Sequence, residues 1–210
     1  MPWICRHKFW VLFIICFFAA VAWGISLTGC STLKDGPPRV QAVGWFTEAE
    51  MRDAVNSVFG PGTYARHSTG QNVRQYNTFR YEDYRAVGRW VWQRTEPWSW
   101  GWLCVQFSQE MRMAMQRAAV RSGYDDKPAA IGWFIVNQRH AWGGVPAGGR
   151  HALNTYVAGP RGEHTVHVKE PQSQVETIVG RQMPDGSWHL YEENYPNLPY
   201  VEEGGVFLEL

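Results

Sequence analysis

The pattern of hydrophobic and polar residues divides the chain into an apolar N-terminal run, two helical stretches and a series of short strands. Residues 9–27 are almost wholly apolar. Residues 103–121 carry apolar side chains at intervals of three and four, the spacing of one helix face, and predict the clearest helix of the chain. Gly123 follows it, and a glycine at that point is expected to end the helix.

A shorter helix is predicted over residues 48–59. Thr47 and Glu50 stand three residues apart at its start and have the sequence pattern of a capping box. Gly60-Pro61-Gly62 follows its last turn and should stop it. Residues 69–78 are polar and are expected to form a loop.

Short runs of strand-like residues follow the long helix. They span residues 131–136, 151–157, 164–169, 177–183 and 188–192, with a Pro184-Asp185-Gly186 turn before the last run. Residues 79–93 hold aromatic side chains at spacings that fit neither a helix nor a strand. One long helix followed by a meander of strands predicts an α+β fold, with a single domain over residues 41–210. Residues 195–210 should form either a terminal strand, near residues 205–208, or a flap.

The apolar N-terminal run has the features of an export signal. A basic stretch, Arg6-His7-Lys8, precedes it, no acidic residue occurs before Asp35, and Leu27-Thr28-Gly29-Cys30 closes it. That tetrapeptide resembles the lipobox of bacterial lipoproteins, in which the chain is cut before the cysteine and the thiol carries a diacylglycerol. We therefore expect a signal peptide over residues 1–29 and a lipidated tether over residues 30–40. An uncleaved membrane anchor is the alternative, because nineteen apolar residues nearly match the ~20 that span a bilayer.

The predicted location of the domain and its net charge limit the classes of partner that it can bind. Either form of the N-terminus places the domain in the cell envelope, attached on the periplasmic side of a bacterial membrane, through lipidated Cys30 in the favoured case. A formal net charge of +1 argues against nucleic-acid binding, which requires a clustered basic surface.

The cysteine positions suggest a nucleophile rather than disulfides. Cys5 and Cys16 leave with the signal peptide and Cys30 takes the lipid, so Cys104 remains as the one free thiol facing an oxidising compartment. Such a thiol is an intermolecular partner, a buried inert group or a nucleophile. Cys104 falls in the first turn of the long predicted helix, where the helix dipole lowers a thiol pKa, and this position favours the nucleophile.

A cysteine nucleophile needs a base, and the base needs an orienting group. His151 begins a predicted strand, which would hold its ring rigidly, whereas His140 is followed by two glycines and a proline. We favour His151 and keep His140 as a possible alternative base. Glu170 follows the predicted strand 164–169 and precedes Pro171. If that strand lies beside the strand of His151, Glu170 can accept the imidazole N–H and complete a triad.

This order of residues resembles the transglutaminase-like superfamily. The resemblance covers about residues 90–175, and three segments carry it: Trp102-Leu103-Cys104-Val105-Gln106-Phe107-Ser108, His151-Ala152-Leu153-Asn154 and Glu170-Pro171-Gln172. It implies a papain-like core, with Cys104 at the start of a helix packed on an antiparallel sheet and with His151 and Glu170 on successive strands.

The sequence also departs from that superfamily's pattern. Gly101 stands three residues before the cysteine instead of two, Ser108 stands where alanine is common, and Glu170 replaces the more frequent aspartate. His140-Ala141-Trp142 matches the usual histidine motif at least as well as the segment at His151 does, so the identity of the base stays open at this point.

The resemblance implies acyl transfer on amide bonds, by hydrolysis or transamidation, in peptides or proteins of the envelope, without a cofactor or metal. The backbone N–H of Cys104 is a candidate oxyanion donor, and Trp98, Trp100 and Trp102 are expected to wall the cleft or pack in the core.

Two other functions remain open. In an NlpC/P60-like cell-wall peptidase a later histidine, rather than Glu170, would touch the His151 ring. In a non-catalytic lipoprotein interaction module Cys104 would lie far from any histidine. A zinc site formed by His151, His164 and His167 is disfavoured, because the spacing is not that of usual zinc ligands.

Overall fold

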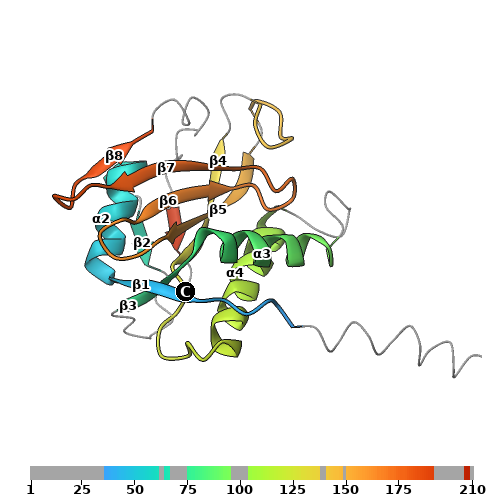
Figure 1. Cartoon of the computed structure of the whole chain (residues 1–210). Coiled ribbons are helices and arrows are strands. Elements are labelled where there is room, and N and C mark those ends of the chain that lie inside the picture. Colours follow the sequence, from blue (N-terminus) through green and yellow to red (C-terminus); the bar gives the residue numbers. More distant parts are fainter. Residues whose placement is uncertain are drawn as a thin grey trace, which may run out of the picture. The chain divides into compact units, whose positions relative to one another are not determined.

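Three helices are formed by the part of the chain that the structure describes. The computed structural model describes residues 36–61, 64–66, 75–95, 104–137, 141–148, 150–191 and 206–208. The helices are α2 (Glu48–Phe59), α3 (Tyr81–Trp92) and α4 (Cys104–Arg121) (Figure 1). The chain divides into two units after Gly36, and the second unit contains all the described helices and strands. The predicted signal peptide and Cys30 lie outside the described residues.

Both predicted helices are confirmed. At the start of α2, the Glu50 N–H donates to the Thr47 hydroxyl (3.2 Å) and the Thr47 N–H donates to the Glu50 carboxylate (2.7 Å), so the capping box is formed. The helix ends at Gly60, whose φ of 99° favours glycine over residues with a side chain. Helix α4 begins at Cys104 itself and ends at Arg121, before Gly123.

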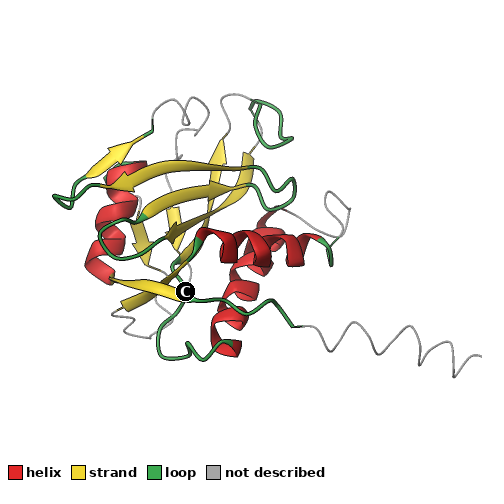
Figure 2. Cartoon of the chain, viewed as in Figure 1, coloured by secondary structure: helices red, strands yellow, loops and turns green. Residues whose placement is uncertain are grey.

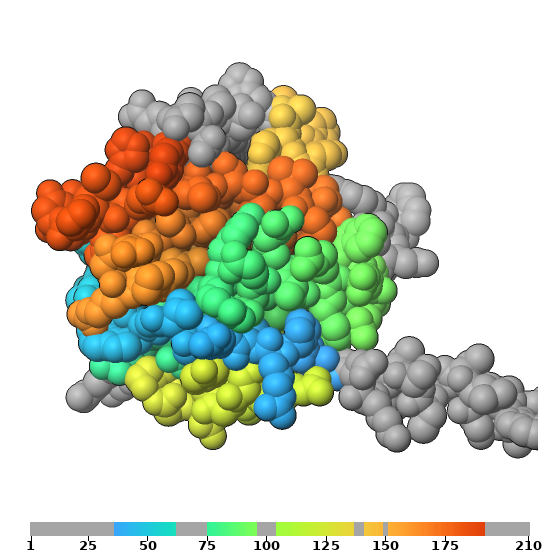
Figure 3. Space-filling model, in the orientation of Figure 1, coloured from blue at the N-terminus to red at the C-terminus, as the bar shows by residue number. Residues whose placement is uncertain are grey.

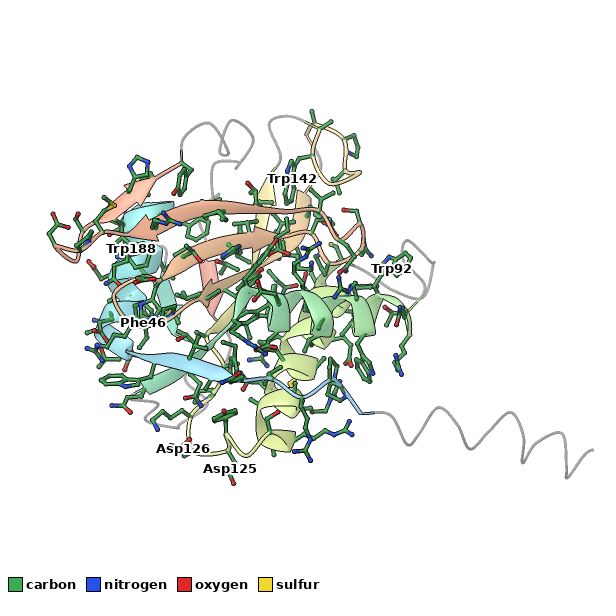
Figure 4. The ribbon with its side chains drawn as sticks, viewed as in Figure 1. Phe46, Trp92, Asp125, Asp126, Trp142 and Trp188 are labelled. Atoms are coloured by element: carbon green, nitrogen blue, oxygen red, sulfur yellow. The ribbon has the colours of Figure 1, made fainter. Side chains whose placement is uncertain are left out.

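Helix α3 occupies the aromatic stretch that the sequence pattern left unassigned. Its buried face is formed by Asp83, Tyr84, Val87, Gly88 and Val91, which recur at intervals of one, three and four residues. Trp92, the last residue of the helix, has 43% of its surface exposed (Figure 4), and Trp90 is only half-buried. Large aromatic residues on both faces, together with a buried aspartate, obscure the helical period.

The strands form one mixed sheet and one short pair. The main sheet contains β1 (Ala42–Thr47), β3 (Gln75–Phe79), β4 (Ile131–Asn137), β5 (Arg150–Ala158), β6 (Thr165–Lys169), β7 (Glu176–Gln182) and β8 (Trp188–Leu190). The five predicted runs after the long helix correspond to β4 to β8 and are confirmed, as is the turn at residues 184–186. The loop predicted over residues 69–78 is wrong for Gln75–Thr78, which form most of β3, and residues 69–74 lie outside the described ranges.

Strands β4 to β8 make an antiparallel meander with β5 and β6 at its centre. Strands β1 and β3 pair antiparallel and join the meander where Phe79 lies beside Ala158 in a parallel contact. The C-terminal segment forms a strand: β9 (Val206–Leu208) pairs in parallel with β2 (Tyr64–Arg66).

Two apolar cores lie on opposite faces of the sheet, and helices lie on both of these faces (Figure 2). Leu153 and Val157 of β5 belong to the first core, which packs against α2. Tyr156 and Ala158 of the same strand belong to the second, which packs against α3 and α4. This alternation is the two-residue period of a strand covered on both faces. The fold is therefore α+β, with a seven-stranded sheet between helices.

The first residues of the second unit are bound to α3 and α4 (Figure 3). Arg121 donates to the Pro37 carbonyl (3.1 Å) and the Val40 N–H donates to the Ser122 hydroxyl (2.8 Å). The Gln41 N–H donates to the buried Asp83 carboxylate (3.0 Å). The predicted tether, residues 30–40, thus has its last four residues fixed to the domain. No helix in the described ranges is long and apolar enough to cross a membrane.

Candidate active site

Cys104 is the first residue of α4 and is half-buried. The N–H groups of a first helical turn have no partner within the helix, and their dipoles create a positive potential at this end. This potential stabilises the thiolate that forms when a thiol at this position loses its proton. The structure thus places Cys104 at the helix start, as the sequence predicted.

Two buried polar side chains join the first turns of α4 to the sheet. The Ser108 hydroxyl donates to the Ala152 carbonyl on β5 (3.2 Å). The Asn154 amide donates to the Ser108 carbonyl (2.9 Å) and to the Gly132 carbonyl on β4 (3.1 Å). Neither side chain has any exposed surface. These bonds set the position of α4 along β5, and hence the position of Cys104 relative to the neighbouring His151.

His151 lies near the start of β5, and only 3% of its surface is exposed. Its ring is hydrogen-bonded to the thiol of Cys104. Its Nε2 is hydrogen-bonded to Oε2 of Glu170. The structure therefore brings all three predicted residues together, over 66 positions of sequence.

Glu170 follows the last residue of β6 and is fully buried. Its second carboxylate oxygen, Oε1, accepts the backbone N–H of Gln172 (2.8 Å). Its own N–H donates to the Val175 carbonyl (2.8 Å) across the turn between β6 and β7. Both carboxylate oxygens thus have donors, which is the condition for keeping a charged acid inside a protein.

The electrostatics favour a thiolate–imidazolium pair. Burial raises the pKa of the Cys104 thiol, but the hydrogen bonds from His151 and from the Ala152 backbone outweigh it, so the pKa lies below its ordinary value. Burial also lowers the pKa of His151, and the bonds to Cys104 and Glu170 overcome this and raise it to about 9. Both shifts favour the proton on the imidazole over the proton on the sulfur.

A tight turn over residues 142–145 covers Glu170. Trp142 and Val145 exchange backbone hydrogen bonds of 3.0 and 2.9 Å around Gly143 and Gly144. A Cβ atom at Gly143 would lie 3.0 Å from both Cβ and Cγ of Glu170, and the Gly143 φ of 63° is in the left-handed region. A side chain at this position would therefore be strained by the backbone conformation and crowded by Glu170. Trp142 is partly buried against the first core and lies at the β4–β5 side of the sheet (Figure 4).

The other buried histidines have partners away from the triad. His164 Nδ1 is hydrogen-bonded to the Gln182 amide oxygen (3.0 Å), and its ring packs on Phe46 with a centroid distance of 4.0 Å. His167 Nε2 is hydrogen-bonded to the Thr165 hydroxyl (2.8 Å). Within the ranges that the structure describes, no group of three or more His, Cys, Asp or Glu side chains is arranged to hold a metal ion.

Several predicted residues lie outside the described ranges. These are His140, Trp98, Trp100, Trp102 and the lipidation site Cys30. His151 is thus the candidate base for which the structure gives a contact with Cys104.

No protein-family model matches the chain, and a search of the curated proteins finds no match to it. We therefore argue its function from the geometry of the site.

Sequence reasoning missed the residues that support the triad. Asn154 and Ser108 lie in the segments that resemble the superfamily, but the sequence does not indicate that the Asn154 amide donates to the Ser108 carbonyl. The Gly143-Gly144 pair carried a turn signal, which was interpreted only as a reason to disfavour His140. Two adjacent glycines, three and four residues past His140, were the available signal for a close backbone approach.

Proposed function

We propose that the chain is a membrane-anchored lipoprotein enzyme of the transglutaminase-like superfamily with a papain-like core. Its triad of Cys104, His151 and Glu170 catalyses acyl transfer on amide bonds of envelope peptides or proteins. One observation carries the proposal: a thiol at the start of α4 shares a hydrogen bond with a buried imidazole, whose other side is held by a buried carboxylate.

The chemistry follows from the proton positions. The Cys104 thiolate attacks the carbonyl carbon of a carboxamide or peptide, and the carbonyl becomes a tetrahedral oxyanion. His151, already protonated, gives its proton to the departing amine as the C–N bond breaks and a thioester forms. Water or a second amine then attacks the thioester, giving its proton to His151 and releasing the thiolate. Water completes a hydrolysis and an amine completes a transamidation.

Each remaining group has a supporting role in this scheme. Glu170 stabilises the imidazolium and fixes which ring nitrogen faces the sulfur. The backbone N–H of Cys104, at the first position of α4, is a donor for the oxyanion, because a first-turn N–H has no acceptor inside the helix.

The contacts of the His151 ring favour this function over an NlpC/P60-like peptidase. The third group is Glu170, while His164 is bonded to Gln182 and His167 to Thr165. A non-catalytic module on the same scaffold is disfavoured as well, because the thiol is hydrogen-bonded to a histidine.

The activity is tested on the full chain in detergent with iodoacetamide as the probe. The alkylation of Cys104 is followed by peptide mass spectrometry, which separates it from the other three cysteines. We expect Cys104 to react at neutral pH and the His151→Ala variant to react at least tenfold more slowly there, because the thiol pKa rises when its ion-pair partner is lost. Equal rates in the two proteins would refute the proposal.

The reaction and the anchor are tested separately. A fluorescent primary amine offered with a glutamine-containing protein reports transamidation, and release of ammonia or of a new amino group reports hydrolysis. Neither product should form with Cys104→Ser. Labelled palmitate should be incorporated into the wild-type chain in bacterial cells and not into Cys30→Ser, and equal labelling would remove the lipid anchor from the proposal.

A further inference from the structure

Lys169 and Glu170 are consecutive residues whose side chains lie on opposite faces of the sheet. Glu170 packs under Gly143 and binds His151. Lys169 extends towards α3, where its Cε lies 2.8 Å from the place that a Cβ of Gly88 would occupy. Only 2% of the Lys169 surface is exposed. The acid of the triad thus stands directly beside a buried cation on the same strand end.

Lys169 is paired with Glu176 on the neighbouring strand. The Lys169 ammonium lies 3.1 Å from Oε2 of Glu176, whose side chain is 6% exposed. The other carboxylate oxygen accepts a hydrogen bond from the Tyr156 hydroxyl and lies 3.4 Å from Nδ1 of His167. Arg85 and Arg89 of α3 and Glu170 also act on the charge of Lys169.

Aromatic stacking fixes this cluster in place. The His167 ring lies between Tyr81 of α3 and Tyr156 of β5, with ring centroids 4.9 and 4.8 Å away. Tyr84 stacks on the far side of Tyr156 at 4.1 Å. Glu176 therefore has little freedom to move, since Tyr156, which donates a hydrogen bond to it, and the neighbouring His167 ring are held in one stack.

The pair closes the turn that carries Glu170. Lys169 and Glu176 are directly opposite one another in the β6–β7 ladder, and residues 170–175 form the turn between them. Inside that turn, the next hydrogen bond runs from the Glu170 N–H to the Val175 carbonyl. The direction in which Glu170 leaves the sheet is thus set by the pair immediately before it.

Stability gives little reason to bury this pair. Desolvation of two ions usually offsets their attraction, and an apolar pair of similar shape is often as stable. Burial disfavours both charges, since it lowers the pKa of Lys169 to about 8 and raises the pKa of Glu176 to about 7. The ion pair instead fixes the direction in which the turn leaves the sheet, because the two charged groups have one favoured arrangement.

We propose that the Lys169–Glu176 ion pair is a positioning element that aims Glu170 at His151. This inference rests on the proposed function. It assigns to Lys169 and Glu176 no contact with substrate, only control of the turn whose first residue orients the base.

The test measures the His151 ring directly. The imidazole is titrated by NMR in the full chain carrying Cys104→Ser, so that the result does not depend on the thiol, and its signal is assigned by comparison with His151→Ala. We expect Lys169→Met to raise the acid dissociation constant of the His151 imidazolium roughly tenfold, part of the change that Glu170→Gln produces. With Cys104 restored, its alkylation rate at neutral pH should fall by a similar factor.

Gln182→Met is the matched control. Gln182 bonds to His164 at the other end of the same two strands, so its loss weakens the β6–β7 pair without touching the turn at Glu170. It should leave the His151 titration at the parental value. If Lys169→Met does not fold, as judged by circular dichroism, Glu176→Gln takes its place with the same expectation.

The outcomes separate the two proposals. A folded Lys169→Met or Glu176→Gln protein with an unchanged His151 titration overturns the positioning inference, as does an equal shift in Gln182→Met. Failure of His151→Ala to slow the alkylation of Cys104 overturns the proposed function instead, and the NMR comparison still gives its own answer.

Discussion

The carboxylate of Glu170 is hydrogen-bonded to Nε2 of His151, and water has almost no access to either side chain. The two residues come from adjacent antiparallel strands, β5 and β6, so their separation is set by the sheet rather than by a loop alone. The same ring is hydrogen-bonded to the thiol at the start of α4. The chemistry of the site depends on this contact.

Removing the charge of Glu170 should therefore weaken the thiolate. In Glu170→Gln the shape is retained but the imidazolium loses its counter-ion, so the pKa of His151 falls and the pKa of Cys104 rises. We expect alkylation of Cys104 near neutral pH to slow by roughly ten- to a hundredfold, which corresponds to about one to two decades in the thiol's dissociation constant. A rate within twofold of wild type would show that Glu170 does not act through the ring.

The reactivity and the activity should have different pH profiles. Alkylation needs only the thiolate, so its rate should rise with pH around a midpoint below the ordinary thiol value and then level off. Acyl transfer also needs the proton on His151, which is lost above about 9, so that rate should fall again on the alkaline side. Initial rates from pH 4 to 11 with buffers of constant ionic strength would give both curves. A single curve for both would contradict the role of His151 as the acid.

Gly143 offers a test of the turn over the acid. In Gly143→Ala the new methyl group would meet Glu170, and the residue would also be held at a φ of 63°. Gly148→Ala is the matched control, because its φ of 78° imposes the same backbone strain while nothing lies within 4 Å. Both should lower the free energy of unfolding by about 1 kcal/mol from strain. Only Gly143→Ala should add a clash and slow the alkylation of Cys104.

Denaturant unfolding and alkylation rates measured on the same samples decide this comparison. Equal losses of stability with equal alkylation rates would mean that the turn does not restrain Glu170.

Replacing Asn154 should lower both the stability of the protein and the reactivity of Cys104. Its amide binds two carbonyl groups, one on α4 and one on β4, and the side chain is completely buried. Asn154→Ala leaves both carbonyls without that donor, and we expect a loss of roughly 2–4 kcal/mol in the free energy of unfolding. Ser108→Ala removes one neutral hydrogen bond and should cost about 1 kcal/mol. Both should slow alkylation by displacing α4 along β5, with Asn154→Ala the larger effect.

The elements with clear periodicity were predictable, and those with mixed character were not. The α4 helix and the strands β4 to β8 have one dominant buried face or a regular alternation, so their positions follow from the sequence. In α3, by contrast, Trp92 is exposed and Trp90 is only half-buried, while Asp83 turns into the core because its carboxylate accepts bonds from Gln41 and Arg80. No rule of local patterning anticipates a buried aspartate whose partner is 42 residues away.

The triad itself was predictable because each member stands at the end of a regular element. Cys104 begins a helix, His151 lies near the start of a strand and Glu170 follows one, and adjacent strands bring such ends together. The supporting residues were not predictable for the opposite reason. Gly143 leaves room for Glu170 because it has no side chain. The role proposed for Lys169 depends on the face of β6 that is turned away from the site.

Helix α4 has the thiol at one end and the entry of the chain at the other. Arg121, its last residue, holds Pro37, while Cys104 is its first, and 18 residues at about 1.5 Å each separate the two by about 27 Å. The chain therefore enters the domain at the end of α4 that is farther from the nucleophile, so a group attached through these first residues would not crowd Cys104 from that side.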